Sequence, residues 1–221
     1  MVGPGEIARR ARSRASHRLE SLPILALNVH SACNCRCVMC DIWKANSDKR
    51  EISPAELDRH VDAIRELHVQ RVMLTGGEPL LHRNLWSLCV KLQALGIRIT
   101  LVTTGLLIEQ HAAAIAAAVD TVVISLDGNR DTHDGIRRVK GGFERIGKGM
   151  RAVRAQDPAP RLIARSVVQR GNFATLDQTI AAAHRMGVDE ISFLCADVSS
   201  AAFTRPVAWS DERIAEVAIP A

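Results

Sequence analysis

Four of the six cysteines in the chain lie in the stretch Cys33-Asn34-Cys35-Arg36-Cys37-Val38-Met39-Cys40. Three of them, Cys33, Cys37 and Cys40, have the spacing C-x3-C-x2-C. Three thiolates in one loop can hold three corners of a cubane iron-sulfur cluster and leave the fourth iron open to a small ligand. The loop therefore predicts a metal centre with an open coordination position.

The remaining cysteines decide between an iron-sulfur cluster and a structural zinc site. Zinc needs four ligands, usually in two separated pairs. Outside the loop the chain has only Cys89 and Cys195, which are single residues in a predicted helix and a predicted strand. We expect Cys195 to be a small buried side chain and Cys35, which fits none of the three positions, to be a spectator thiol. The cluster is thus favoured over zinc.

Length and charge bound the organisation of the chain. Its 221 residues suit one core domain, 23–221, after a basic N-terminal arm, 1–22. The arm holds five arginines against two glutamates, which gives +3 of the net charge of +5, and it lacks interleaved aromatic residues. We interpret it as a solvated helical face or a frayed arm, and do not expect nucleic acid as a partner. The last helix, which begins at Ser210-Asp211, is expected to be truncated.

The core alternates short apolar segments with segments of helical periodicity. Strands are predicted at 22–29, 71–74, 97–102, 121–126, 161–168 and 190–195, and helices at 54–67, 84–95, 108–118, 143–155 and 176–186. This alternation indicates parallel strands with helical crossovers. Six units are fewer than the eight of a closed barrel, so we expect an α/β fold of the partial (β/α)6 barrel type with parallel strands. A doubly wound sheet is the alternative that periodicity leaves open.

Polar residues follow each predicted strand. In parallel folds ligands bind at the carboxyl ends of the strands. After the cysteine loop these positions are Gly76-Gly77-Glu78-Pro79, Thr103-Thr104-Gly105, Ser125 with Asp127, Gln169 with Asn172, and 197–200. We expect the six loops to meet at one mouth. Because none has a partner at ligand spacing, we expect surface or capping roles for His82, His111, His133 and His184.

Three of these motifs carry a family resemblance. The cysteine loop with Asp41-Ile42-Trp43, the segment Gly76-Gly77-Glu78-Pro79 and the segment Ser125-Leu126-Asp127-Gly128 resemble radical SAM enzymes. The branch is that of the SPASM-type peptide-modifying and sulfatase-maturing members. The resemblance covers roughly residues 23–200 and lacks their cysteine-rich C-terminal extension, since no cysteine follows Cys195.

The resemblance implies a cofactor set and an activity. Cys33, Cys37 and Cys40 would bind a [4Fe-4S] cluster and form the catalytic centre, with S-adenosylmethionine on the open iron. Reduction would yield methionine and a 5′-deoxyadenosyl radical that abstracts hydrogen from an unknown substrate, a peptide or a small molecule. It also implies an electron donor such as flavodoxin or ferredoxin. The alternative is a catalytically silent iron-sulfur protein that serves as a scaffold or partner. With no apolar run long enough to cross a bilayer, we expect a cytoplasmic protein without a membrane partner.

The resemblance further implies which residues bind S-adenosylmethionine, namely Gly76, Gly77, Glu78, Thr104, Ser125, Asp127 and Arg137. Glu78 would supply negative charge toward the methionine amino group, and Arg137 would pair with the methionine carboxylate. Two positions depart from the family pattern. Thr104 stands where relatives often have asparagine, and Arg138 stands where they commonly have glycine.

Overall fold

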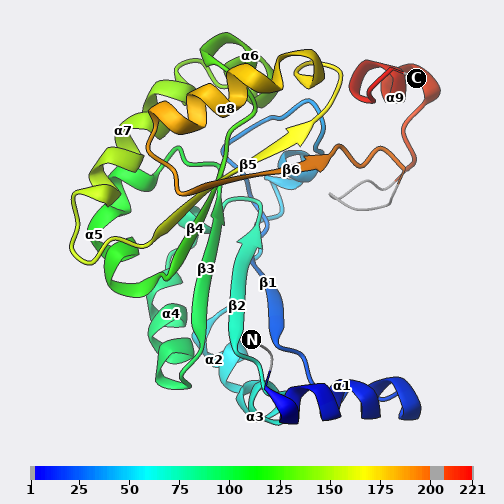
Figure 1. The fold of residues 1–221 in the computed structure, drawn as a ribbon, viewed down its shortest axis with the longest axis vertical. Helices are drawn as coiled ribbons and strands as arrows, with labels where there is room; N and C mark the ends of the chain where they lie inside the picture. Colours follow the sequence, from blue (N-terminus) through cyan, green and yellow to red (C-terminus); the bar gives the residue numbers. More distant parts are fainter. Residues whose placement is uncertain (1–2, 200–206, 221) are drawn as a thin grey trace.

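A computed structural model describes residues 3–199 and 207–220 and contains one six-stranded parallel sheet (Figure 1). The strands are Ile24–His30 (β1), Arg71–Gly76 (β2), Arg98–Thr103 (β3), Thr121–Ser125 (β4), Arg161–Val168 (β5) and Glu190–Cys195 (β6). Their order in the sheet is β1-β2-β3-β4-β5-β6. A doubly wound sheet reverses its strand order at a switch point, whereas this sheet winds in one direction. The prediction of a partial parallel barrel is therefore confirmed.

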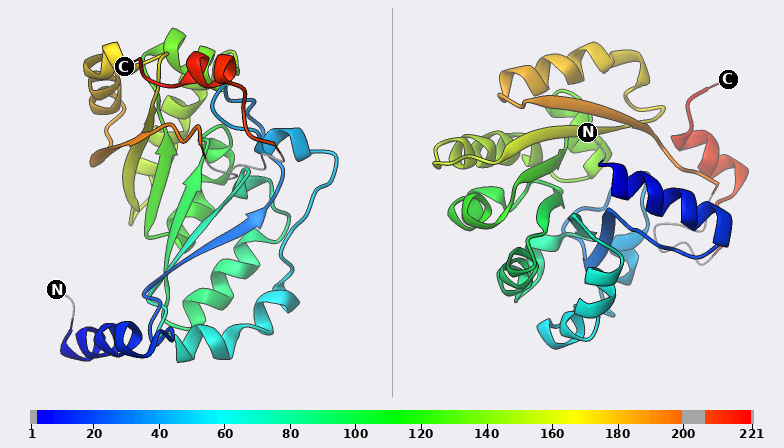
Figure 2. Two further views of the ribbon diagram at one scale, coloured as in Figure 1. Left: turned by 90° about the vertical axis from the view of Figure 1, so that its right-hand side faces the viewer. Right: turned by 60° about the horizontal axis from the view of Figure 1, so that its bottom comes forward.

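The helices cover the outer side of the sheet. Their bounds are Pro4–Ser16 (α1), Pro54–Asp58 (α2), Val61–Glu66 (α3), Leu85–Ala94 (α4), Ile108–Ala118 (α5), Arg130–Arg137 (α6), Gly142–Arg154 (α7), Leu176–Arg185 (α8) and Asp211–Val217 (α9). Figure 2 shows the strands curving inside an arc of helices, while α1 and α9 lie at opposite ends of the molecule. In the described part of the chain, no helix is long and apolar enough to cross a membrane.

Two helical segments differ from the prediction. The single helix expected at 54–67 is two helices, α2 and α3, that meet around Arg59, although the predicted capping box of Ser53 and Glu56 is present. The short helix α6 was not predicted. It buries the polar side chains His133 and Arg137 with Ile136, so its inner face gives no apolar periodicity.

The hydrophobic core lies between the sheet and the outer helices. Side chains that point outward from the strands are aliphatic and almost wholly buried against α4, α5 and α7, among them Leu74, Leu101, Leu88, Ile115 and Ile146. A fully buried aliphatic side chain of this size contributes about 1.5–3 kcal/mol. The strands are therefore fixed from their outer face, which leaves the inner face free to line a site.

We expect Leu88→Ala to lower the free energy of unfolding by about 2–5 kcal/mol, because it leaves a cavity in the core under α4. The matched control is Val90→Ala on the same helix, since Val90 is 63% exposed. We expect that control to change stability by less than about 0.5 kcal/mol. Urea denaturation followed by circular dichroism measures both, and similar losses for the two variants would contradict the assignment of α4 to the core.

Candidate functional site

The cysteine loop follows β1 and is held by hydrogen bonds from distant segments. The backbone amide of Cys33 donates to Asn46 Oδ1, and Asn46 Nδ2 donates to the Cys33 carbonyl, both at 2.9 Å. The amide of Val38 donates to the carbonyl of Ile136 in α6 at 2.9 Å. The loop thus has a defined conformation in the protein chain alone.

Three of the four cysteines in this loop face one cavity. Cys33, Cys37 and Cys40 line a cavity of about 300 Å³ at the carboxyl ends of the strands. Cys35 does not line it and packs instead in a small apolar cluster with Met39 and Val217. The structure thus separates the three cysteines with the motif spacing from the fourth.

The thiols differ in their electrostatic environment. A hydrogen bond from Cys35, supported by the charge of Arg137, lowers the pKa of Cys37 to about 6. The Arg137 Nη1 atom lies 3.7 Å from Cys37 Sγ. A hydrogen bond from Cys35 also lowers the pKa of Cys33, whereas burial raises the pKa of Cys40 to about 11. Two of the three candidate ligands are therefore biased toward the thiolate, the form that binds metals.

The described residues contain no group of three His, Cys, Asp or Glu side chains close enough to hold a single metal ion. A multinuclear cluster spreads its cysteine ligands over different irons. The donor set of three thiols around one cavity accordingly fits a cluster by its chemistry and its placement.

Gly76 and Gly77 press against the start of the cysteine loop. A Cβ atom at Gly76 would lie 2.3 Å from the carbonyl oxygen of His30, and one at Gly77 would lie 2.1 Å from that of Ala32. Gly76 also has φ of +130°, a region that side chains rarely allow. The amides of Gly77 and Glu78 donate to these same two carbonyls at 2.7 and 2.8 Å. The absence of side chains here allows β2 to dock onto the loop as well as allowing a ligand to approach.

The carboxylate of Glu78 is fully buried, and burial raises its pKa. Its oxygens accept hydrogen bonds from the amide and hydroxyl of Thr104 at 2.7 and 2.6 Å, and from the Thr103 hydroxyl at 2.8 Å. Glu78 does not line the cavity, whereas Thr104 does. The structure thus shows Glu78 joining the ends of β2 and β3, and its contact with an ammonium group stays a prediction.

The end of β4 is organised by a buried ion pair. Arg137 Nε donates to Asp127 Oδ2 at 2.5 Å, and the Val167 amide donates to Asp127 Oδ1 at 2.8 Å. Ser125 and Arg137 line the cavity, but Asp127 lies behind Arg137 with no exposed surface. The next residue, Arg138, has φ of +53°, which explains why glycine suits this position.

The histidine expectation is wrong for His82 and His133, which are buried. His133 Nδ1 accepts a hydrogen bond from the Asp127 amide at 3.2 Å. Burial and the neighbouring charge of Arg137 lower the pKa of His133 to about 4. His133 is therefore neutral at pH 7 and supports the ion pair from behind.

The expectation for Cys195 is also wrong, because this thiol is exposed and lines the cavity. It is the last residue of β6, an edge strand of the sheet, so no further strand in the described chain covers it. The same cavity contains Arg165 of β5, which the sequence analysis did not single out. The alternation of Arg161, Ile163, Arg165 and Val167 is the signal that could have placed it on the inner face.

The C-terminal helix covers the cysteine loop. Trp209 Nε1 donates to Asp41 Oδ2 at 2.8 Å, and Arg213 donates to the carbonyl of Val38. Val217 is buried beside Cys35 and Cys37. These contacts join residues more than 160 positions apart, so local sequence patterns did not predict them.

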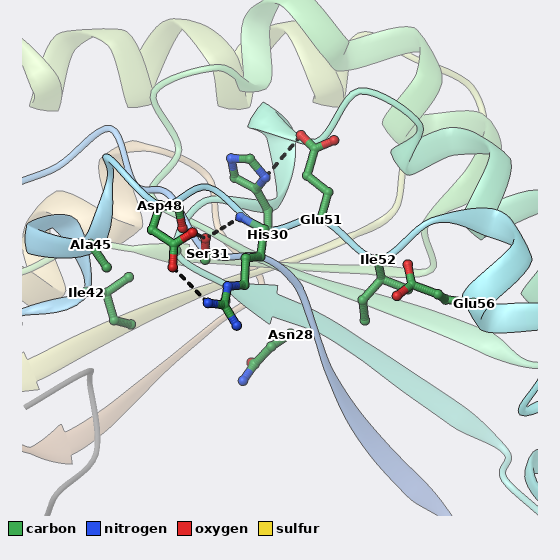
Figure 3. Close-up of a pocket in the computed structure, with 12 residues that line it drawn as sticks. Asn28, His30, Ser31, Ile42, Ala45, Asp48, Glu51, Ile52 and Glu56 are labelled. Carbon is green, nitrogen blue, oxygen red and sulfur yellow. Dashed lines mark hydrogen bonds and ion pairs between the residues drawn. The ribbon is translucent and has the colours of Figure 1, made fainter.

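A second cavity of about 470 Å³ lies at the edge of β1 (Figure 3). The segment around Glu51 pairs with the end of β1, and His30 Nδ1 lies 3.2 Å from Glu51 Oε1. Gly76, Gly77 and Ile42 line both cavities. The residues near Glu51 therefore cover the outer edge of the strand that leads into the cysteine loop.

Residues 27–159 match the family model described as the Radical SAM superfamily. The mycofactocin maturase MftC of Mycolicibacterium smegmatis is 34% identical over 161 residues, which are 71% of this chain and 40% of that protein. The AdoMet-dependent heme synthase of Methanosarcina barkeri is 29% identical over 168 residues, 74% and 48% of the two chains. This chain thus spans less than half the length of these curated relatives.

Among solved structures, Streptococcus suis SuiB bound to S-adenosylmethionine superposes with a TM-score of 0.69 at 17% identity. The superposition covers 96% of this chain and 50% of SuiB. At this identity the likeness establishes a shared fold.

We expect Gly77→Ala to lower the free energy of unfolding by at least about 1–3 kcal/mol, because its Cβ would overlap the Ala32 carbonyl. The control is Gly135→Ala in α6, where a Cβ meets nothing within 4 Å. That variant should be unchanged or more stable by up to about 1 kcal/mol. Thermal and urea denaturation compare the two, and a neutral Gly77→Ala would contradict the close docking of β2 onto the loop.

We also expect His133 to make stability depend on pH. Its folded pKa of about 4 lies below the usual 6.5, so the unfolded state binds the proton more tightly. The contribution is present above pH 6.5 and is lost as the pH falls toward 4. Between pH 7 and pH 5 the wild type should lose about 2 kcal/mol more than His133→Gln. Parallel urea titrations test this, and equal pH slopes would show that His133 is not buried in its neutral form.

Proposed function

Because the chain belongs to the radical SAM superfamily, we propose that it is an enzyme that cleaves S-adenosylmethionine reductively. The family uses a [4Fe-4S] cluster together with S-adenosylmethionine. The observation that carries the proposal is that Cys33, Cys37 and Cys40 line one cavity. When bound, these cofactors supply a 5′-deoxyadenosyl radical that removes a hydrogen atom from the substrate.

The three cysteines would hold the cluster as thiolates. Arg137 assists by its charge beside Cys37, since the same contact that lowers the pKa of the thiol favours the form that binds iron. Cys35 donates a hydrogen bond to this sulfur from outside the cavity. Hydrogen bonds to cysteine sulfur are one of the means by which proteins tune a cluster.

The wall of the cavity would bind S-adenosylmethionine. Thr104 and Ser125 present hydroxyl groups there, and Gly76 and Gly77 present backbone without side chains. Arg137 has guanidinium N–H groups beyond those facing Asp127 and Cys37, and these would bind the methionine carboxylate. Glu78 and Asp127 would act as positioning residues, since both are buried behind the residues that line the cavity.

The apolar surroundings of the cysteine loop would limit access of water. Met39, Leu106 and Ile136 pack beside the cysteines, and Val217 of α9 closes this cluster from the C-terminal side. A dry environment strengthens electrostatic interactions and protects reactive species. The helix α9 would therefore shield the cluster from solvent.

We further propose a peptide or a small molecule as the substrate, because the inner face of the sheet is open at its two edge strands. A donor such as flavodoxin or ferredoxin would supply the electron, since no second cluster of cysteines exists in the sequence. We place the enzyme in the cytoplasm, where free cysteines stay reduced.

The test is anaerobic reconstitution with iron and sulfide, reduction with dithionite and addition of S-adenosylmethionine. The wild type should produce methionine and 5′-deoxyadenosine, measured by liquid chromatography. Cys37→Ala should lose both the full iron content and the product, whereas Cys35→Ala should retain cluster and turnover. A wild type with a reducible cluster that forms no 5′-deoxyadenosine would refute the enzyme, and a full cluster in Cys37→Ala would refute the ligand assignment.

A further inference from the structure

A row of three polar residues crosses the inner face of the sheet on β4, β5 and β6. Arg165 is in register with Ser125 on one side and with Ser192 on the other. Residues in register on neighbouring strands point to the same face of a sheet. Ser125 and Arg165 both line the cavity that contains the three cysteines. The row therefore forms part of the cavity wall.

Arg165 differs from Arg137 in its charge balance. Arg137 is buried and paired with Asp127. Arg165 is half-buried, and within the described ranges it has no carboxylate at ion-pair distance. Its one hydrogen bond among these residues runs from Nε to Ser192 Oγ at 3.2 Å. The two terminal nitrogens thus keep their N–H groups for a ligand.

The chemistry of this arrangement selects a carboxylate. A guanidinium presents parallel N–H groups whose geometry matches the two oxygens of a carboxylate. The neighbouring lining includes Val102, Val167 and Leu194, which suit an apolar group next to the carboxylate. A half-buried cation without an ion partner gains more from such a ligand than a fully solvated one, because water screens it less.

The position of Arg165 favours the substrate over S-adenosylmethionine as the source of this carboxylate. Arg137 lies beside Cys37 and already serves the side of the cavity where the cysteines are. Arg165 instead contacts β6, an edge strand at the open side of the sheet. A substrate that enters from this side would meet Arg165 with its anionic end.

We propose that Arg165, held by Ser192, binds a carboxylate of the substrate. The inference rests on the proposed function, because it places the substrate in the cavity next to the cysteines. It narrows the substrate class to molecules with a free carboxylate next to an apolar group. Arg165 would fix the substrate relative to the reacting centre and set specificity without taking part in the chemistry.

Calorimetric titration of the cluster-loaded protein, saturated with S-adenosylmethionine, tests the proposal with a matched pair of probes. N-acetyl-L-leucine carries the carboxylate, and N-acetyl-L-leucinamide has the same shape without the charge. The wild type should bind the acid about ten- to a hundredfold more tightly than the amide. Arg165→Gln should lose this preference, and Arg165→Lys should keep part of it.

The control variant is Arg161→Gln on the same strand, since Arg161 is exposed and pairs with Glu190 away from the cavity. It should retain the wild-type preference for the acid. Separate titrations with S-adenosylmethionine distinguish the two sources of a carboxylate. A tenfold loss of its affinity in Arg165→Gln, with the preference between probes intact, would overturn the proposal in favour of the cofactor.

Two further outcomes separate this inference from the proposed function. A wild type that binds acid and amide alike, or binds neither, refutes the carboxylate subsite even if 5′-deoxyadenosine is formed. A chain that takes up no cluster but still prefers the acid, and loses the preference in Arg165→Gln, refutes the enzyme and supports the subsite. Circular dichroism of each variant confirms folding, and Arg165→Lys provides the comparison if Arg165→Gln does not fold.

Discussion

The buried ion pair between Asp127 and Arg137 is the interaction on which the rest of the site depends. The carboxylate of Asp127 binds the end of β4 to the Val167 amide on β5, while Arg137 extends from α6 to the sulfur of Cys37. Removing one partner of a buried pair leaves an uncompensated charge and typically costs 3–5 kcal/mol. The same pair thus stabilises the sheet edge and sets the charge beside the cysteines.

This constraint gives the conserved-looking motifs of the sequence two tasks each. Gly76 and Gly77 permit both the docking of β2 on the cysteine loop and the approach of a ligand to their backbone. Glu78 holds the β3 end through Thr103 and Thr104, so the hydroxyl that faces the cavity is positioned by a carboxylate that does not. The polar residues at the strand ends consequently form two layers, of which only the inner one lines the cavity.

Most of the fold was predictable because its signals are local. The strands Arg161–Val168 and Glu190–Cys195 and the helix Ile108–Ala118 match their predicted bounds, since apolar runs and helical periodicity mark them clearly. The helix α6 was missed because its buried face is polar, and the exposure of Cys195 was missed because edge position is a property of the whole sheet. The three motif cysteines were correctly placed at one cavity, but the division between lining residues and supporting residues required the three-dimensional contacts.

The contacts that hold the cysteine loop also order the events of biogenesis. Cys33 to Cys40 leave the ribosome early, yet they are held by Ile136, Arg137 and Arg213, which are synthesised much later. Until those segments arrive, the thiols belong to an incomplete barrel and are exposed to adventitious metals and oxidants. Loading with iron is therefore a late, post-translational step, and the cell must keep four closely spaced thiols reduced throughout synthesis of the remaining chain.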